Sequence, residues 1–368
     1  MALVDVIGAS DFVAQHLHLA LDAGEPSRIA RGLALESSAR SADRVYRKGA
    51  PALAIRAKAM AERLGTPRAR AIERLCDSIT ATATGQWRRA LVSSDQAIAI
   101  LRDDCVGVTW ELNIAQNMHL WGLMYLGELA EVCRRVPTLL ADARRRNNLY
   151  LTTEVCTRSN LVWLVADQPD EGEREVMAAI ATWSQKGFHR QHYSAMLARV
   201  QTALYRDDAG SAWRILTEQE PYFRRSMLTH VQALRVEGLY LRGRSALAMA
   251  SMHRSGGRFL ALARDAARRI ARERMHWSTP LARLLQGGIA SVEGNEPVAV
   301  QRLEEALEQF ERAEMQWYAA VTRRRLGALR RDERGPVLLE QASTWMESQG
   351  IRNPSRITRM LAPGFSSE

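Results

Sequence analysis

Two histidines, His189 and His192, have a spacing that could place two imidazoles on one face of a helix. Such a pair could hold a metal ion, since imidazole is a common metal ligand. A zinc-protease site would also need a neighbouring glutamate and a third ligand, and neither accompanies this pair. We therefore expect hydrogen-bonded structural roles, or a place for His192 in a binding groove, with no metal and no other cofactor.

The lysine pattern bears on phosphate chemistry. Lysine occurs only at Lys48, Lys58 and Lys186, and the next residue is glycine, alanine and glycine in turn. A phosphate-binding loop needs a lysine followed by serine or threonine after a glycine-rich run. Protein kinases need a glycine loop, a strand-borne lysine and two aspartates in fixed motifs. None of these motifs occurs in the sequence, so we interpret the chain as non-enzymatic.

Polar residues interrupt several otherwise apolar helical stretches. A buried polar group costs free energy unless it is paired, so these side chains should face a groove or one another. In a helical-repeat solenoid, the first helix of each pair lines the concave surface, where a partner would lie. The alternative is that they pair internally and fix the helix register. The candidate partner-binding residues are Asn113, Asn117, Arg158, Asn160, His192, Gln201, Arg235 and Glu237.

Basic residues outnumber acidic ones, 51 to 41, and give a formal net charge of +10 that comes almost wholly from arginine. Three arginine runs, at 144–146, 323–325 and 330–331, could neutralise phosphates of a nucleic acid. Each run also lies near the C-terminal part of a predicted helix, where cations complement the helix dipole. Nucleic acid is therefore the less favoured partner, and a protein or peptide is preferred.

The elements that carry these residues are predicted to be helical hairpins. Gly85 permits a tight turn, Trp87 follows two residues later, and the small residues Ala90 and Ala97 allow close helix packing. A similar turn pattern recurs near residues 127 and 294 and, more weakly, near 167, 208, 256 and 335, at spacings of about 40 residues. We expect an all-α, tetratricopeptide-like solenoid, a right-handed superhelix of antiparallel helix pairs.

This reading sets the expected organisation. Residues 1–66 should form N-terminal helices packing on the solenoid, 67–350 the repeats, and 351–368 a capping helix and tail. Single helices are expected over 150–165, 228–252 and 316–329. No apolar run approaches the roughly 18 residues that a membrane span requires, and no secretory leader is evident, so we expect a cytoplasmic protein with no membrane partner.

A family resemblance rests on several segments spread over nearly the whole chain. They are 24–36, Gly85-Gln-Trp87, Trp110-Glu-Leu112, 125–130, 160–163, 183–193 and, most specifically, 345–364. Together they resemble the C-terminal region of large bacterial serine/threonine protein kinases. In that family a eukaryotic-like kinase domain and an AAA-type ATPase segment precede tetratricopeptide-like repeats. Because the kinase and ATPase motifs are absent, no catalytic residue of the family transfers to this chain.

The resemblance implies a regulatory or sensory scaffold for protein-protein interaction in bacterial signalling. Its partner would be a kinase, an ATPase segment or a signalling substrate. An alternative is the sensor region of an ATPase-type transcriptional regulator that contacts nucleic acid through the arginine runs.

Overall fold

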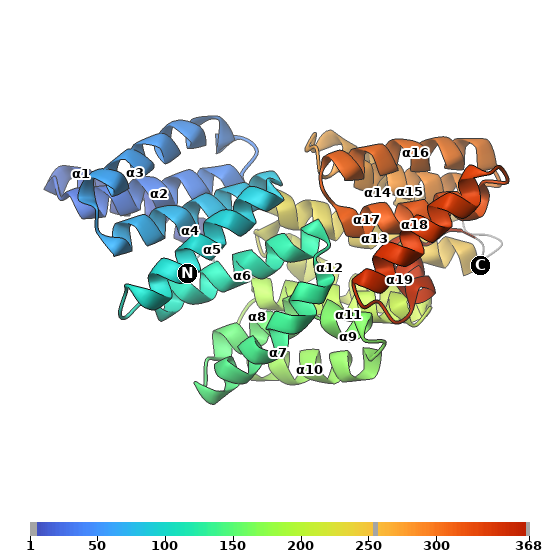
Figure 1. The fold of residues 1–368 in the computed structure, drawn as a ribbon, viewed down its shortest axis with the longest axis horizontal. Coiled ribbons are helices and arrows are strands. Elements are labelled where there is room, and N and C mark those ends of the chain that lie inside the picture. Colours follow the sequence, from blue (N-terminus) through green and yellow to red (C-terminus); the bar gives the residue numbers. More distant parts are fainter. Residues whose placement is uncertain (1–5, 253–256, 366–368) are drawn as a thin grey trace. The chain divides into compact units, whose positions relative to one another are not determined.

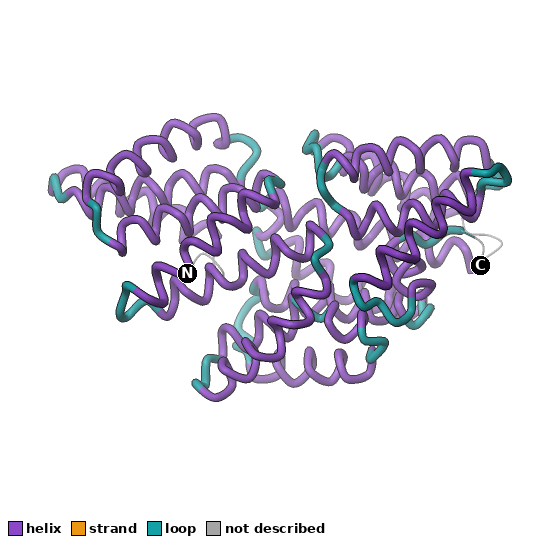
Figure 2. The backbone as a smooth tube through the Cα atoms, in the orientation of Figure 1, coloured by secondary structure: helices purple, strands orange, loops and turns teal. Residues whose placement is uncertain are grey.

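The computed structural model describes residues 6–252 and 257–365. Every regular element in these ranges is a helix, joined to the next by a turn or short loop (Figure 2). The predicted all-α fold class is therefore confirmed for the described part of the chain. None of these helices combines the length and apolar character needed to cross a membrane.

The described residues form two compact units. The first comprises Met1–Met124 and Ser226–Leu234, and the second comprises Tyr125–Arg225 and Arg235–Glu368. In both, successive helices pack as neighbouring pairs, as the colours of Figure 1 allow the reader to follow. The elements up to residue 126 are α1 (Val6–Ala23), α2 (Pro26–Ala42), η1 (Tyr46–Gly49), α3 (Ala50–Leu64), α4 (Pro67–Thr84), α5 (Trp87–Asp103) and α6 (Thr109–Leu126).

Two groups of helices follow α6. The first group is α7 (Leu129–Arg145), α8 (Leu149–Arg158), α9 (Leu161–Val165), α10 (Pro169–Thr182), α11 (Arg190–Tyr205), α12 (Ala209–Arg225), η2 (Leu228–His230) and α13 (Gln232–Met252). The second is α14 (Gly257–Arg272), α15 (Thr279–Val292), α16 (Glu296–Arg312), α17 (Gln316–Leu329), α18 (Arg334–Ser348) and α19 (Pro354–Leu361).

The hairpin signature read from the sequence has the expected geometry at Gly85. This glycine has φ +77°, a left-handed conformation that ends α4. Trp87 is the first residue of α5, and its side chain is buried. Ala90 and Ala97 are completely buried, which lets α5 approach α4 closely. The local pattern of turn, aromatic and small residues therefore predicted this hairpin correctly.

Several other turns use the same left-handed geometry without glycine. Asn147, Asp167, Asp207 and Glu314 have φ between 53° and 64°. Asparagine and aspartate tolerate this conformation better than most side chains, because they can hydrogen-bond locally. The turn expected near Asp208 thus lies one residue away from the left-handed residue, Asp207, and the turn expected near Gly256 lies outside the described residues.

The single helix expected over 150–165 is wrong, because the structure divides it into α8 and α9 at Ser159 and Asn160. Here two backbone hydrogen bonds join residues three apart, as in a 3₁₀ turn. Val162 N–H donates to the Ser159 carbonyl, and Trp163 N–H donates to the Asn160 carbonyl. The Asn160 amide nitrogen also donates to the Ala198 carbonyl at 3.3 Å. The side chain of Asn160 is thus engaged by α11 at the point where the helix breaks.

Two other expectations concern helix limits. The helix expected over 228–252 begins only at Gln232, after the short turn η2, whereas the one expected over 316–329 is α17 without a change of bounds. The division expected at residue 66 stays a prediction. In the structure, Leu33 of α2, Ala57 of α3 and Ile72 of α4 share one apolar cluster across the turn at 65–67.

The C-terminal helix expected after residue 351 is present as α19, and it packs against α11 and α17. Three carbonyls at its end accept hydrogen bonds from buried side chains: Met360 from Arg244 (3.0 Å), Leu361 from Tyr240 (2.8 Å) and Ala362 from Arg325 (3.0 Å). A helix leaves its last carbonyls without partners, and cations are favourable at that end. The end of α19 is thereby fixed in the interior of the second unit.

The start of the same segment is held at a turn far away in the sequence. Arg352 N–H donates to the Val165 carbonyl at 3.0 Å, and the Asp167 carboxylate accepts from Tyr205, Asn353 and Arg356. These donors, the Tyr205 hydroxyl foremost, hold the pKa of Asp167 below its usual value. The last helix therefore fastens the end of the second unit to its α9–α11 region.

Gly127 and Gly294 offer a matched test of the hairpin turns, since both lie in the second unit with positive φ, +87° and +74°. A Cβ at Gly127 would lie 2.7 Å from the Trp317 backbone nitrogen, whereas one at Gly294 meets nothing within 4 Å. We expect Gly294→Ala to reduce the unfolding free energy by about 1–2 kcal/mol through backbone strain. Gly127→Ala should cost about 1–3 kcal/mol more, because it also forces neighbours apart. Urea unfolding followed by circular dichroism measures both, and equal losses would contradict the close approach.

Candidate functional site

Two of the predicted partner-binding residues, Arg158 and Glu237, meet in the interior of the second unit. Arg158, at the end of α8, donates through Nη1 to Glu237 Oε2 at 3.0 Å and through Nη2 to Oε1. Glu237 on α13 also accepts from the Tyr125 hydroxyl at 2.5 Å and the Tyr193 hydroxyl at 3.4 Å. Both charged side chains are only 11% exposed. We call these four residues the Glu237 network.

The two tyrosines of the Glu237 network remain protonated donors. Burial raises the pKa of Tyr125 and of Tyr193 well above the ordinary value, and the negative charge of Glu237 raises both further. The carboxylate thus has a bidentate guanidinium and two hydroxyls as partners, which satisfies a charge that would be costly to bury alone. The network joins helices, because the Glu237 carboxylate on α13 has partners on α6, α8 and α11.

A second buried ion pair lies beside it and was not predicted. Glu154 of α8 is completely buried and accepts from Arg190 and, at 2.8 Å, from the Gln191 side chain. Burial raises the pKa of Glu154, and the positive charge of Arg190 opposes that rise. Glu154 and Arg158 are four residues apart, so they share one face of α8. That spacing was the signal in the sequence that could have identified a polar stripe on the buried side.

The remaining predicted residues are also engaged or enclosed. Arg235 makes a bidentate pair with Glu273, at 2.7 and 2.9 Å, and Asn160 is bonded to α11 as described above. Gln201 of the second unit is buried, and so are Asn113 and Asn117, which lie on α6 in the first unit. Partner binding by these residues stays a prediction. Within the second unit, Arg158, Asn160, Arg235 and Glu237 have hydrogen-bonding partners in the fold.

The histidine pair takes part in local hydrogen bonds at the start of α11. His192 Nδ1 accepts from the His189 backbone N–H at 3.0 Å, and His189 Nδ1 accepts from the Trp183 indole N–H at 3.0 Å. Phe188 stacks on His192 with ring centroids 5.6 Å apart. Across residues 6–252 and 257–365, no three His, Cys, Asp or Glu side chains come together as a metal-binding group. The pair therefore acts as a cap for the first turn of α11.

Six of the eight arginines in the runs have acidic or carbonyl partners within the second unit. Arg144 pairs with Glu175, and Arg145 and Arg146 both pair with Asp142. In the later runs, Arg323 pairs with Glu311, Arg325 donates to the Ala362 carbonyl, and Arg330 pairs with Glu304 and Asp332. These partners offset much of the positive charge that the runs would otherwise present to a phosphate backbone.

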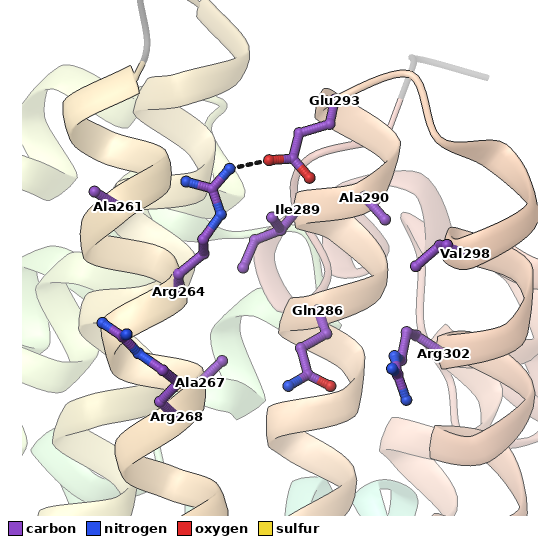
Figure 3. A pocket seen from close by; sticks show the side chains of 10 residues that line it. All are labelled: Ala261, Arg264, Ala267, Arg268, Gln286, Ile289, Ala290, Glu293, Val298 and Arg302. Carbon is purple, nitrogen blue, oxygen red and sulfur yellow. Dashed lines mark hydrogen bonds and ion pairs between the residues drawn. The ribbon is translucent and has the colours of Figure 1, made fainter.

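A surface hollow of about 430 Å³ lies where α14, α15 and α16 run side by side (Figure 3). We call it the α14–α16 groove. Its lining residues are Ala261, Arg264, Ala267 and Arg268 of α14, Gln286, Ile289, Ala290 and Glu293 of α15, and Val298 and Arg302 of α16.

Helical periodicity explains why these side chains meet. On α15, positions 286, 289, 290 and 293 recur at one turn and two turns, so they form one continuous face. The α14 sequence carries five arginines and one aspartate, and Ala263, Ala266 and Ala267 are buried. An ion pair between Arg264 and Glu293 joins α14 to α15 at one end of the groove (Figure 3). The other two arginines of the lining also have carboxylate partners, Asp265 for Arg268 and Glu305 for Arg302, so the groove combines small apolar side chains with a rim of ion pairs.

The Glu237 network yields a prediction on stability. Arg158→Leu leaves a buried carboxylate without its counter-ion and should lower the unfolding free energy by about 3–5 kcal/mol. The double variant Arg158→Leu/Glu237→Leu removes both charges and should recover most of that loss, because an apolar pair can replace a buried ion pair. Urea unfolding of the wild type, both single variants and the double variant gives the coupling free energy. Additive losses in the double variant would contradict a mutually dependent pair.

The histidine cap predicts a dependence of stability on pH. Burial, followed by repulsion from His189, lowers the pKa of His192 in the folded chain. The unfolded chain therefore binds more protons, and stability falls as the pH drops from about 6.5 through the lower folded pKa. His192→Gln keeps an acceptor without a titrating group and should flatten the dependence between pH 7.5 and 5.5. His276→Gln, at an exposed position, is the control, and an unchanged slope in His192→Gln would refute the assignment.

No protein-family model matches the chain, and no curated protein matches its sequence. The resemblance to the C-terminal region of bacterial serine/threonine kinases therefore stays a prediction that rests on the sequence segments given above. Over residues 6–252 and 257–365, the structure shows paired helices, buried polar side chains that are paired with one another, and the α14–α16 groove.

Proposed function

We propose that this chain is a helical-repeat scaffold that binds a protein partner in bacterial signalling and has no catalytic role of its own. The observation that carries the proposal is the α14–α16 groove, a surface hollow that small apolar side chains line between arginine–carboxylate ion pairs. Protein partners commonly dock in such grooves with apolar anchors surrounded by polar contacts. The kinase-like repeat resemblance supports a regulatory setting for this interaction, in the cytoplasm.

The packing of the second unit supports a scaffold more than a reaction site. Burial raises the pKa of Tyr125, Tyr193 and Glu154, and all three are hydrogen-bonded inside the fold, the two tyrosines to Glu237 and Glu154 to Gln191. Structural ion-pair networks perturb pKa values as catalytic sites do, so access to a substrate is the deciding feature. These groups face the interior, whereas the α14–α16 groove faces outward.

The ion pairs of the arginine runs weigh against the alternative of a sensor region that contacts nucleic acid. A phosphate-binding surface gains affinity from cations that are free to release counter-ions. In the runs at 144–146 and 330–331, carboxylates already lie against Arg144, Arg146 and Arg330. Protein binding through the groove is therefore the function that we favour.

Site-specific photo-crosslinking in cells tests this function. Ala261 lies exposed on the rim of the groove and Glu308 is exposed on α16 outside the groove lining, so p-benzoylphenylalanine at each position gives a matched pair. We expect discrete protein adducts from position 261 that are missing from position 308. Equal labelling at both positions, or none at 261, would remove the support for a partner at this groove.

A further inference from the structure

Residues 351–365, which we call the α19 segment, lie across helices that are far from them in the sequence (Figure 1). The α19 helix packs on α11 and α17, side chains of α13 donate to its last carbonyls, and a Cβ at Gly288 of α15 would be 2.7 Å from the Pro363 carbonyl oxygen. These four helices are the first members of successive helix pairs. Because first helices line the concave surface of a helical-repeat solenoid, the α19 segment occupies the place of a peptide ligand.

The surface under the α19 segment binds main-chain groups of the segment. Arg244 and Arg325, which are only 2% and 3% exposed, donate to carbonyls at the end of α19. At the other end, the Val165 carbonyl accepts from Arg352 N–H at 3.0 Å. Every helix ends in carbonyls without intrahelical partners, whatever its sequence. The same donors can therefore bind the end of a short helix from another protein.

Ion pairs and buried apolar side chains define the kind of helix that fits this surface. The α19 segment contains three arginines and no acidic residue. The Arg356–Asp167 pair has an N–O distance of 3.1 Å and the Arg359–Asp207 pair one of 3.4 Å, and both pairs are partly exposed. The apolar side chains of α19 that are completely buried are those of Ile357, Met360 and Leu361. The site is thus complementary to a short helix with one apolar and one cationic face.

Two properties favour exchange of the α19 segment for another helix. Its two ion pairs are partly exposed, and such pairs contribute little to stability. With eight residues, α19 is too short to stay helical when it leaves the site, so it loses conformational entropy on each return. The tether offsets this loss with an effective concentration on the order of millimolar. A helix that a folded partner already holds in shape avoids the entropy loss and can bind more tightly.

We propose that the α19 segment is an internal ligand that closes the concave surface of the second unit, and that a partner protein binds there by displacing it with a cationic amphipathic helix. The end of the partner helix accepts from Arg244 and Arg325, and its arginine or lysine side chains pair with Asp167 and Asp207. This site shares no residue with the lining of the α14–α16 groove, so it goes beyond the proposed function and does not depend on it.

A labelled peptide with the sequence of residues 351–365 tests the proposal against the full chain. In the wild type the internal segment covers the site, so fluorescence anisotropy should show weak binding. Arg356→Glu/Arg359→Glu places carboxylates next to Asp167 and Asp207, which repel the internal segment. This variant should bind the peptide at least tenfold more tightly than the wild type. Equal affinity of the two chains for the peptide would overturn the proposal.

Matched variants separate specific binding from a loss of folding. Arg214→Glu/Arg312→Glu makes the same change of charge at exposed positions of α12 and α16, and it should bind the peptide as weakly as the wild type does. Asp167→Arg/Asp207→Arg reverses the charge of the site, so it should prefer, at least tenfold, a peptide with glutamate in place of both α19 arginines. If this chain and the variant with the reversed segment preferred the same peptide, the proposal would be wrong, because unfolding alone does not reverse a preference.

Hydrogen exchange measures the opening of the α19 segment without any peptide. In the wild type, the amide protons of residues 357–362 should exchange at least tenfold faster than those of α17, because the segment leaves its site while the helix pairs stay folded. Arg356→Glu/Arg359→Glu should accelerate exchange at 357–362 at least tenfold further and leave α17 unchanged. Equal exchange rates of the two regions in the wild type would show that the segment opens only with the whole unit, which contradicts a displaceable ligand.

Discussion

Glu237 places a carboxylate inside a bundle of helices, and the positions of its partners constrain the whole second unit. Its donors come from the end of α6, from α8 and from α11, and each must reach the same two oxygens. An unpaired charge in this position would be costly, so helices that slip by one turn lose the network as well as their apolar contacts. The Glu237 network and the adjacent Glu154 pair therefore fix register as well as satisfying polar groups.

The same constraint engages polar side chains of the helices that surround Glu237. In a solenoid of helix pairs, the concave side is the usual binding face, yet here the inward side chains of α8, α11 and α13 are joined to one another. The α19 helix then contributes its last carbonyls to Arg244 and Arg325, which closes the interior further. The α14–α16 groove, by contrast, is a hollow on the surface of the second unit.

Arginine has several different roles in this chain, and its abundance alone does not identify a nucleic-acid ligand. Arg158, Arg190 and Arg244 are buried and hold carboxylates or carbonyls, as the planar guanidinium allows. Arg144 and Arg330 form ion pairs nearer the surface. Arg264 and Arg268 of α14 differ from these arginines because they lie beside the apolar side chains of the α14–α16 groove.

The sequence by itself determined the features that depend on residues close along the chain. Helix periodicity, the left-handed turn at Gly85, the packing of Trp87 and the bounds of α17 all follow from interactions within a few residues. Only the tertiary structure decided which polar side chains are paired, since Arg158 and Glu237 are 79 residues apart and Tyr125 and Glu237 are 112 apart. The groove likewise needs three helices side by side. The sequence of each helix indicates only which of its own faces is apolar, so no local pattern specifies how the three helices lie together.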